Sequence, residues 1–446
     1  MVRVPARTPL LVAASAAVLL LVGSPAATAA DGVPPAPAPA VLDPVPVTSS
    51  TAPAPTPDGV RGEVGRLARR GLAAGSVLIV DPSTGTVLLD QGADRPRTPA
   101  STAKLTTAAA ALTVLGPQAR LATVAYRDGN TVYLVGGGDP TLVRQGGGNP
   151  LAGGSASLRE LAQSVSEGFT ALAPVTLVFD SSAFRGARLG PGWSSSFPAA
   201  GVAAPVTALV VDGGRTRPGS LSRVQDPAKQ AASVFAGFLR GQGLDVVSIA
   251  PGRLDPAATE VGRVESPPVA DIVERMLTES ENNYAEALAH LVGGALLGKP
   301  TFAGGAEATT QALAKLGIDT TGLALVDGSG LSRRNLVPVR VLADVLTGVA
   351  RATTAALTPI APGLAVAGLT GTLANRFGTA ATRAGRGFVH AKTGTLTGVV
   401  SLAGIVQDAD GRVLVFAMIA NKVASLAKAR DTMDVIASRL ATCGCT

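Results

Sequence analysis

Side chains that commonly build metal centres and covalent frameworks are scarce in this chain. Among its 446 residues there are 2 histidines and 2 cysteines, and aromatic residues make up 3%. His290 and His390 are too far apart in the sequence for the usual ligand spacing of a zinc site. Cys443 and Cys445 lie too close together to join distant parts of the chain. We therefore expect no metal, no cofactor and no disulfide framework.

Charged residues and long hydrophobic runs are also few. Only 15% of the residues are charged, and the Arg333-Arg334 pair is isolated, so we expect no nucleic-acid partner. The formal net charge of +7 would attract anionic envelope polymers, although ordinary surface arginines explain it equally well. After the N-terminal segment, no stretch reaches the roughly eighteen uninterrupted apolar residues of a membrane span, so we expect no transmembrane segment after signal cleavage.

The N-terminus has the pattern of an export signal followed by a spacer. Arg3 and Arg7 precede an apolar run from Leu10 to Val22, and Ala27-Thr28-Ala29 matches a cleavage site. We therefore expect a signal peptide over residues 1–29 and an exported, extracytoplasmic protein in the cell envelope, periplasmic space or medium. Residues 30–58 are rich in Pro and Ala and predict an extended linker.

The remaining chain mixes helical and strand patterns, which predicts an α+β fold. Two long apolar strands near the C-terminus, 398–407 and 412–420, predict central antiparallel strands covered by helices on both faces. Other predicted strands are 77–80, 86–89, 123–127, 131–135 and 175–180, with scattered strands over 186–225. Predicted helices are 61–72, 101–115, 158–167, 228–241, 269–277, 283–292, 306–316 and a terminal helix from about 424.

Ser101-Thr102-Ala103-Lys104 places a hydroxyl and an amine on one face at the start of a predicted helix. A serine is a weak nucleophile until a neighbouring base takes its proton. Lys104 can be that base only if burial depresses its pKa, and the apolar run that follows it offers such burial. Taken alone, the pattern also fits an ordinary helix N-terminus, where Ser is common.

Two further patterns lie far downstream. Lys392-Thr393-Gly394-Thr395 immediately precedes the long apolar hairpin, so the lysine and the hydroxyls could hold a carboxylate beside a strand edge. The alternative is a lysine that merely ends a strand at a turn. Ser280-Glu281-Asn282 lies between two predicted helices, where loops carry catalytic groups, although Ser280 could equally cap the helix beginning near Asn283.

The three patterns in this order resemble the class C low-molecular-mass penicillin-binding proteins, the D-alanyl-D-alanine carboxypeptidase/endopeptidase family. The resemblance covers about residues 77–420, and the long interval between Lys104 and Ser280 is typical of this class. One departure is Glu281, where the family usually has Asp. Further matching stretches are Gly136 to Leu142, Asn283 to Glu286, Asp327 to Arg333 and Gly371 to Leu373.

The resemblance implies a serine transpeptidase-like (β-lactamase-like) catalytic domain, in which an antiparallel sheet is covered by helices. We expect this domain over residues 59–117 and 263–446, with a β-rich domain inserted at 118–262. It also implies a serine-type D-Ala-D-Ala carboxypeptidase that acts on peptidoglycan stem peptides through an acyl-enzyme, with DD-endopeptidase activity left open. β-Lactam antibiotics are the implied covalent inhibitors.

Residue roles follow from the resemblance in the same way. Ser101 would be the nucleophile and Lys104 its base, while Ser280 would relay a proton to the leaving group. The implied substrate-binding residues are Asn282, Lys392, Thr393, Gly394 and Thr395.

Two alternatives remain open from the sequence. A β-lactamase would need an efficient deacylating base, for which no candidate glutamate loop is visible. A non-catalytic peptidoglycan-binding protein would not need all three patterns intact.

Overall fold

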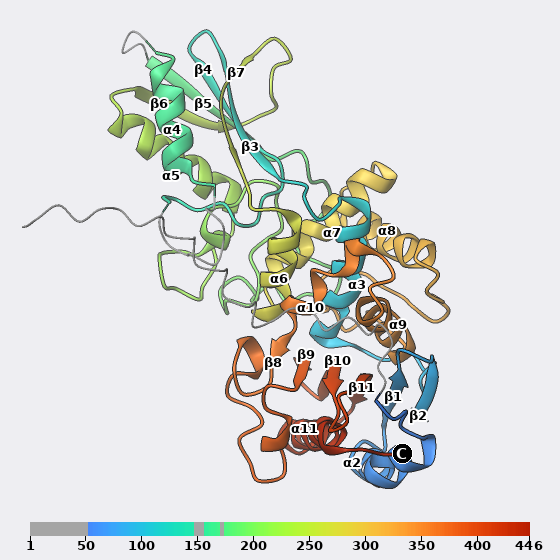
Figure 1. Ribbon diagram of the computed structural model, residues 1–446. Coiled ribbons are helices and arrows are strands. Elements are labelled where there is room, and N and C mark those ends of the chain that lie inside the picture. Colours follow the sequence, from blue (N-terminus) through green and yellow to red (C-terminus); the bar gives the residue numbers. More distant parts are fainter. Residues whose placement is uncertain (1–51, 147–155, 170–173) are drawn as a thin grey trace, which may run out of the picture. The chain divides into compact units, whose positions relative to one another are not determined.

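The strands of the protein form two separate sheets, seen in the computed structural model, which describes residues 52–146, 156–169 and 174–446 (Figure 1). The predicted signal peptide, 1–29, and the part of the predicted linker before residue 52 lie outside the described residues. Helices and strands alternate irregularly along the chain, which confirms the predicted α+β class.

The first sheet has six strands in the order β2-β1-β11-β10-β9-β8, and every neighbouring pair is antiparallel. The predicted hairpin near the C-terminus is confirmed, since β10 and β11 pair along their whole lengths. The strands are β1 (Gly75–Asp81), β2 (Thr86–Gln91), β8 (Ala365–Val366), β9 (Val389–Leu396), β10 (Val399–Gln407) and β11 (Val413–Asn421).

The central strands are buried on both faces because alternate side chains enter two different cores. In β11, Val415 and Ala417 belong to one core, whereas Leu414 and Phe416 belong to the other. The helices on the first face are α3 (Lys104–Val114), α6 (Val269–Thr278), α7 (Asn282–Leu297), α8 (Phe302–Lys315), α9 (Val339–Ala350) and α10 (Ile360–Gly363). The second face is covered by α2 (Arg66–Gly71) and α11 (Leu426–Thr442), which confirms helices on both faces.

The first helical segment begins earlier than predicted. It starts at Pro57 with α1 (Pro57–Val60) and continues through a π-helical turn, η1 (Arg61–Gly65), into α2. The side chain of Thr56 accepts a hydrogen bond from the backbone N–H of Gly59 at 3.0 Å, and a proline in the first turn favours a helix start. The last two residues of the predicted linker, 30–58, therefore belong to this helix. The N-cap at Thr56 stabilises the helix start there despite the Pro/Ala-rich composition.

The second sheet has five strands in the order β6-β5-β4-β3-β7. The predicted hairpin of β3 and β4 is confirmed, and β4, β5 and β6 are parallel to one another. The strands are β3 (Ala122–Asp128), β4 (Thr131–Gly136), β5 (Pro174–Asp180), β6 (Asp245–Pro251) and β7 (Thr259–Glu265). Two helices, α4 (Leu158–Glu167) and α5 (Pro227–Gly241), pack with this sheet in a core of its own.

The sheet and its two helices lie between Ala122 and Glu265, close to the predicted insertion at 118–262. The expectation of scattered strands over 186–225 was wrong. That stretch has no strand and a single short 3-10 helix, η3 (Asp212–Gly214), and it is rich in Gly and Pro. The insertion as a separate domain stays a prediction.

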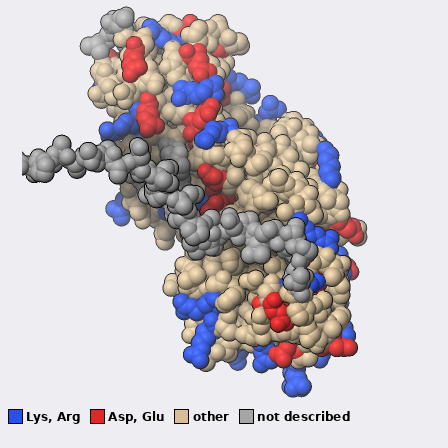
Figure 2. All heavy atoms as spheres, viewed as in Figure 1, with Lys and Arg blue, Asp and Glu red and all other residues tan. Residues whose placement is uncertain are grey.

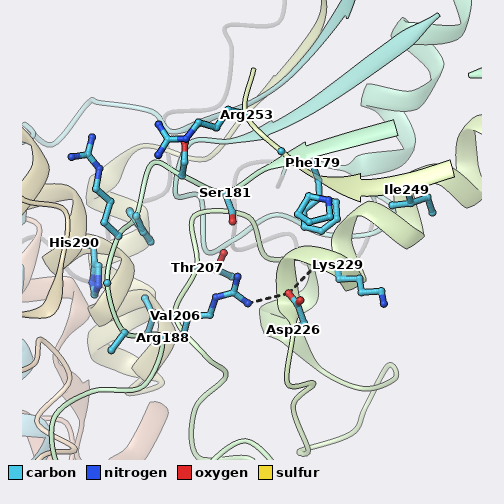
Figure 3. Close-up of a pocket in the computed structure, with 17 residues that line it drawn as sticks. Phe179, Ser181, Arg188, Val206, Thr207, Asp226, Lys229, Ile249, Arg253 and His290 are labelled. Carbon is cyan, nitrogen blue, oxygen red and sulfur yellow. Dashed lines mark hydrogen bonds and ion pairs between the residues drawn. The ribbon is translucent and has the colours of Figure 1, made fainter. Parts of the chain in front are cut away.

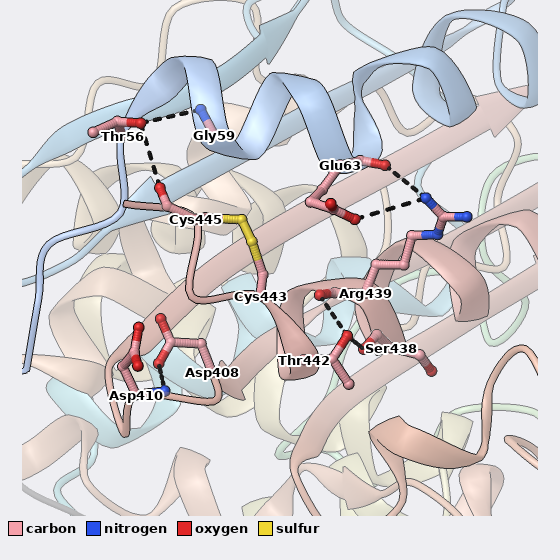
Figure 4. The surroundings of a disulfide bond; sticks show 10 residues. All are labelled: Thr56, Gly59, Glu63, Asp408, Asp410, Ser438, Arg439, Thr442, Cys443 and Cys445. Atoms are coloured by element: carbon pink, nitrogen blue, oxygen red, sulfur yellow. Dashed lines mark hydrogen bonds and ion pairs between the residues drawn. A yellow bond between two sulfur atoms is a disulfide. The ribbon is translucent and has the colours of Figure 1, made fainter.

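A disulfide joins Cys443 and Cys445 just after α11, so the two cysteines do pair but connect no distant elements (Figure 4). The distant contact is made by the backbone instead. The carbonyl of Cys445 accepts a hydrogen bond from the N–H of Thr56 at 2.7 Å, which ties the residues after α11 to the start of α1.

Across the described ranges, no single helix has the length and apolar character to cross a membrane, and one bent pair of segments, 339–350 with 355–363, passes that test on length and composition alone.

Candidate active site

Ser101 lies in a single 3-10 turn, η2 (Ala100–Ala103), that leads directly into α3. The residue before it, Ala100, is buried and has a φ of 50°, a backbone conformation that non-glycine residues rarely adopt. The turn is held in place through Pro99, whose carbonyl accepts hydrogen bonds from Ser401 Oγ at 2.6 Å and Thr102 Oγ1 at 2.8 Å. Strained backbone of this kind is typical of functional sites.

Two glycines let other segments approach this turn. A Cβ on Gly394 in β9 would lie 3.0 Å from the backbone N of Ser101 and 2.9 Å from the carbonyl O of Pro99. A Cβ on Gly330, which has a φ of +81°, would overlap the carbonyl O of Ala100. The strand and the loop can therefore contact the serine turn only because neither position carries a side chain.

Lys104, one helical turn after Ser101, is fully buried. Its Nζ donates hydrogen bonds to Ser101 Oγ at 3.1 Å, to Asn282 Oδ1 at 2.7 Å and to the carbonyl O of Ser329 at 2.8 Å. Burial lowers the pKa of Lys104 to about 8, although the nearby carboxylates of Glu286, Asp327 and Glu281 act in the opposite direction. A neutral amine is therefore accessible at moderately alkaline pH.

The Ser329 carbonyl that accepts from Lys104 lies in a loop held by two buried carboxyl groups, those of Glu286 and Asp327. Neither residue was predicted as a site residue from the sequence. Glu286 accepts hydrogen bonds from the N–H of Gly328 at 3.0 Å and of Ser329 at 2.8 Å. Asp327 accepts from the N–H of Gly330 at 2.9 Å and of Ser332 at 2.6 Å. Both residues fall in stretches that match the family pattern, so the sequence carried a signal but did not indicate this role.

Asn282 is the first residue of α7, and its side-chain amide is held on both sides. Its Oδ1 accepts from Lys104, and its Nδ2 donates to the carbonyl O of Val202 at 2.8 Å, so a residue of the predicted insertion reaches the site. Asn282 is therefore a hydrogen-bond partner of Lys104 in the structure. Its role in binding a substrate amide stays a prediction.

Ser280 precedes α7 and has a φ of 60°. The alternative interpretation, a serine that caps the helix, was wrong, since the N-cap is Glu281 and no side chain caps this end. Within the described ranges, the Ser280 hydroxyl has no hydrogen-bond partner in the protein. The hydroxyl is therefore free to bond to another molecule.

Lys392 lies on β9, fully buried, with its Nζ donating to the carbonyl O of Thr393 at 3.2 Å. Its pKa is lowered well below the usual value, first by burial and second by the charge of Lys104. The second cause shows that the two amines lie within electrostatic reach of each other. Burial also lowers the pKa of His390, two residues earlier on the same strand.

The outer edge of β9 is open where the site residues begin. Within the described residues, the short strand β8 pairs with His390 and Ala391 alone, so the segment 392–396 has no described strand as a neighbour on that side. Thr393 Oγ1 donates to Thr372 Oγ1 at 2.9 Å, whereas Thr395 is exposed. Hydroxyls and unpaired backbone groups are therefore presented along one strand edge.

The structure thus brings Ser101, Lys104 and Asn282 into one hydrogen-bonded group, with Lys392 and Gly394 beside it. Within the described residues, no cluster of three His, Cys, Asp or Glu side chains is placed to hold a metal ion. The arrangement can activate a serine with one buried amine, that of Lys104, while a second buried amine, that of Lys392, lies nearby.

Comparison with known families gives a match along most of the chain. The model of the D-Ala-D-Ala carboxypeptidase 3 (S13) family matches residues 68–222 and 216–442. Carboxypeptidase DacB of Mycolicibacterium smegmatis is 39% identical over 374 residues, which cover 82% of this chain and 80% of that protein. A carboxypeptidase of Mycobacterium tuberculosis is 36% identical, with 86% of this chain and 82% of that protein covered.

Among solved structures, penicillin-binding protein 4 (dacB) of Haemophilus influenzae is similar in fold. It has a TM-score of 0.72 at 23% sequence identity, and the match covers 84% of this chain and 98% of that chain. The same protein in complex with a β-lactam matches with a TM-score of 0.66 at 22% identity, covering 84% of this chain and 98% of that chain.

Proposed function

Since the chain belongs to the D-Ala-D-Ala carboxypeptidase 3 (S13) family, we propose that it cleaves the D-Ala-D-Ala ends of peptidoglycan stem peptides through an acyl-enzyme on Ser101. The observation that carries the assignment of Ser101 is the contact with Lys104. A fully buried amine whose pKa is lowered to about 8 lies 3.1 Å from a serine hydroxyl in a strained turn.

In the first step, neutral Lys104 takes the proton of Ser101, whose Oγ attacks the carbonyl carbon of the penultimate D-alanine. The backbone N–H groups of Ser101 and Thr395 then hold the oxyanion, and such a donor is worth roughly 3–4 kcal/mol. The close approach of Gly394 to the backbone N of Ser101 supports this pairing, because it brings β9 beside the nucleophile.

The terminal carboxylate of the substrate is held by Lys392 together with the hydroxyls of Thr393 and Thr395. The open edge of β9 supports this role, since an extended peptide can add to it with backbone hydrogen bonds. Lys392 is buried and, among the described residues, bonds only the backbone oxygen of Thr393, so its amine is available to an anionic ligand. A bound carboxylate would raise the pKa of this amine again, against the lowering by burial and by Lys104.

The proton that Lys104 took from Ser101 is relayed through Ser280, with Lys392, to the amine nitrogen of the departing D-alanine, so Ser280 gains a proton as it gives one up. Asn282 orients both Lys104 and the substrate amide. The free hydroxyl of Ser280 supports the first role, because it can bond to the leaving group without first breaking a protein hydrogen bond. Water then attacks the acyl-enzyme carbonyl and restores Ser101. DD-endopeptidase activity stays a prediction, tested by comparing release of D-alanine from a free pentapeptide with cleavage of cross-linked dimers.

β-Lactams are expected to acylate Ser101, as the β-lactam complex of the Haemophilus influenzae protein supports. Mass spectrometry of the intact protein after incubation with penicillin should show one adduct, absent from Ser101→Ala, with both proteins folded by thermal melting. Folded wild-type protein without an adduct would contradict the assignment. Rapid loss of the adduct with penicillin turnover would favour the β-lactamase alternative, and peptidoglycan binding without any adduct would favour a non-catalytic binder.

Export to the cell envelope is also part of the proposal. It is supported by the signal pattern in residues 1–29 and by the location of peptidoglycan outside the cytoplasm. N-terminal sequencing of protein recovered from the envelope or the medium tests it, and a mature chain that begins after Ala29 is the expected result.

A further inference from the structure

A cavity that Ser101 does not line is formed by residues of the second sheet, of α5 and α7 and of the loops between them (Figure 3). Its volume is about 720 Å³, within the range of roughly 300–1,000 Å³ that small-ligand sites occupy. Residues that follow the parallel strands β5 and β6 form one wall, among them Ser181 and Arg253. The carboxyl ends of parallel strands are where open sheets commonly bind ligands.

The lining of this cavity is strongly basic. Arg185, Arg188, Lys229 and Arg253 line it, and Asp226 is the one carboxylate among the lining residues. Arg188 pairs with Asp226 at 3.3 Å, whereas the other three cations have no ion pair within the described part of the chain. On the face shown in Figure 2, by contrast, basic and acidic side chains are interspersed over the second-sheet region. The cavity therefore has an excess of positive charge that a bound anion can neutralise.

Polar and aromatic groups complete the lining in a way that suits a sugar. The hydroxyl residues Ser181 and Thr207 line the cavity together with the aromatic residues Phe179 and Phe184. His290 contributes a hydrogen-bonding nitrogen, since its Nδ1 bonds the carbonyl O of Glu286 at 2.8 Å and Nε2 has no protein partner within the described ranges. Because a carbonyl can only accept, Nδ1 carries the proton and Nε2 is left as an acceptor.

The cavity and the serine site share one helix. Asn282 begins α7 in the serine site, and His290 lies on the same helix at the cavity. At about 1.5 Å per residue, the two positions are about 12 Å apart along the helix axis. A polymer a few sugar units long could therefore contact both places.

We propose that this cavity binds an anionic saccharide segment of a cell-envelope polymer, with Arg185, Lys229 and Arg253 facing its acidic groups. The acidic groups can be sugar-borne carboxylates or phosphodiesters, which share the charge and the hydrogen-bonding geometry that guanidinium groups recognise. The proposal concerns a separate binding site and does not depend on the roles assigned to Ser101 or Lys392.

The test is a binding titration of the full chain with fluorescently labelled saccharides, followed by anisotropy. One probe is peptide-free peptidoglycan glycan, which carries a carboxylate on alternate sugars; a second is a polysaccharide of N-acetylhexosamine units joined by phosphodiesters; a third is neutral chitooligosaccharide of matched length. At least one anionic probe should bind about tenfold more tightly than the neutral one. The triple variant Arg185→Gln, Lys229→Gln, Arg253→Gln should weaken that binding by about tenfold.

A matched control removes the same charge elsewhere, with Arg69→Gln, Arg70→Gln and Lys428→Gln. These three exposed residues on α2 and α11 form no ion pair with any residue that the structure describes. This control should leave the affinity unchanged, and an equal loss would overturn the proposal, as would no binding of either anionic probe. The charge-conserving variant Arg185→Lys, Arg253→Lys should bind more tightly than the triple variant, because it keeps the charge, and more weakly than the wild type, because lysine lacks the bidentate guanidinium geometry. The anionic probe that binds more tightly shows whether the acidic groups are carboxylates or phosphodiesters. Penicillin labelling of the same samples tests Ser101 independently, so a failure of the cavity proposal can be told apart from a failure of the serine assignment.

Discussion

The buried amine of Lys104 should set the pH dependence of acylation. Its pKa is lowered to about 8 by burial, so the form that can accept the proton of Ser101 grows as the pH rises through that value. About one amine in ten is neutral at about pH 7, and about nine in ten at about pH 9. The second-order rate constant for acylation by a fluorescent penicillin should therefore rise about tenfold over this interval, measured by stopped flow.

The same experiment separates two opposing effects on the pKa of Lys104, which burial lowers and the nearby carboxylates raise. Glu286 is the carboxylate with the largest effect in raising the pKa of Lys104, against the larger lowering by burial. Burial, and next the charge of Asp327, raise the pKa of Glu286 itself to about 8, so its charge develops over the same pH range. Glu286→Gln removes this charge, so the midpoint of the pH profile should move to lower pH. Glu167→Gln, an exposed change at the end of α4, should leave the midpoint in place.

A profile that is flat between about pH 6 and pH 10, or a midpoint at the ordinary lysine value near 10.5, would contradict Lys104 as the titrating base. A rise of the midpoint in Glu286→Gln would contradict it as well. Because the readout is a midpoint and not a rate, a partial loss of active protein in the variant does not imitate the expected result. Thermal melting of each variant checks that the fold is retained.

Two further predictions concern Ser280, which precedes α7, and Gly330, which lies against the turn that carries Ser101. Ser280→Ala should abolish release of D-alanine and leave the melting temperature nearly unchanged, because the hydroxyl has no protein partner among the described residues; full turnover would remove its assigned role. Gly330→Ala should destroy penicillin labelling, since its Cβ would overlap Ala100 and displace Ser101. Gly317→Ala, with a nearly equal φ of +80° and open space around its Cβ, should keep labelling and incur only a backbone strain of about 1–3 kcal/mol.

The elements that the sequence predicted well are those whose own pattern decides their structure. In β10 and β11 nearly every side chain is buried, and in α4 the predicted bounds, 158–167, match because one face is apolar and Ser157 caps the start. Three of the predicted site residues, Ser101, Lys104 and Asn282, share one group of hydrogen bonds, and spaced patterns with defined chemistry were what singled them out in the sequence.

Other features depend on contacts that no local pattern records. Helix α9 is rich in valine, a β-branched residue that disfavours helix formation. The helix forms because its apolar side chains are buried in the core between the first sheet and the helices on its first face. Strands β6 and β7 were missed because most of their side chains remain at least partly exposed and leave no apolar alternation. The role of Glu286 requires a loop some forty residues later to place its N–H groups at the carboxylate, which only tertiary structure supplies.

The three contacts of the Lys104 amine have a consequence for the direction of proton transfer. Two of its partners, the carbonyl of Ser329 and the Oδ1 of Asn282, can only accept, and Asn282 is kept in this orientation by its bond to Val202. When the amine loses a proton, its two remaining hydrogens stay with those oxygens. The lone pair is then left pointing at the Ser101 hydroxyl, so deprotonation by itself aims the base at its target without any rotation of the side chain.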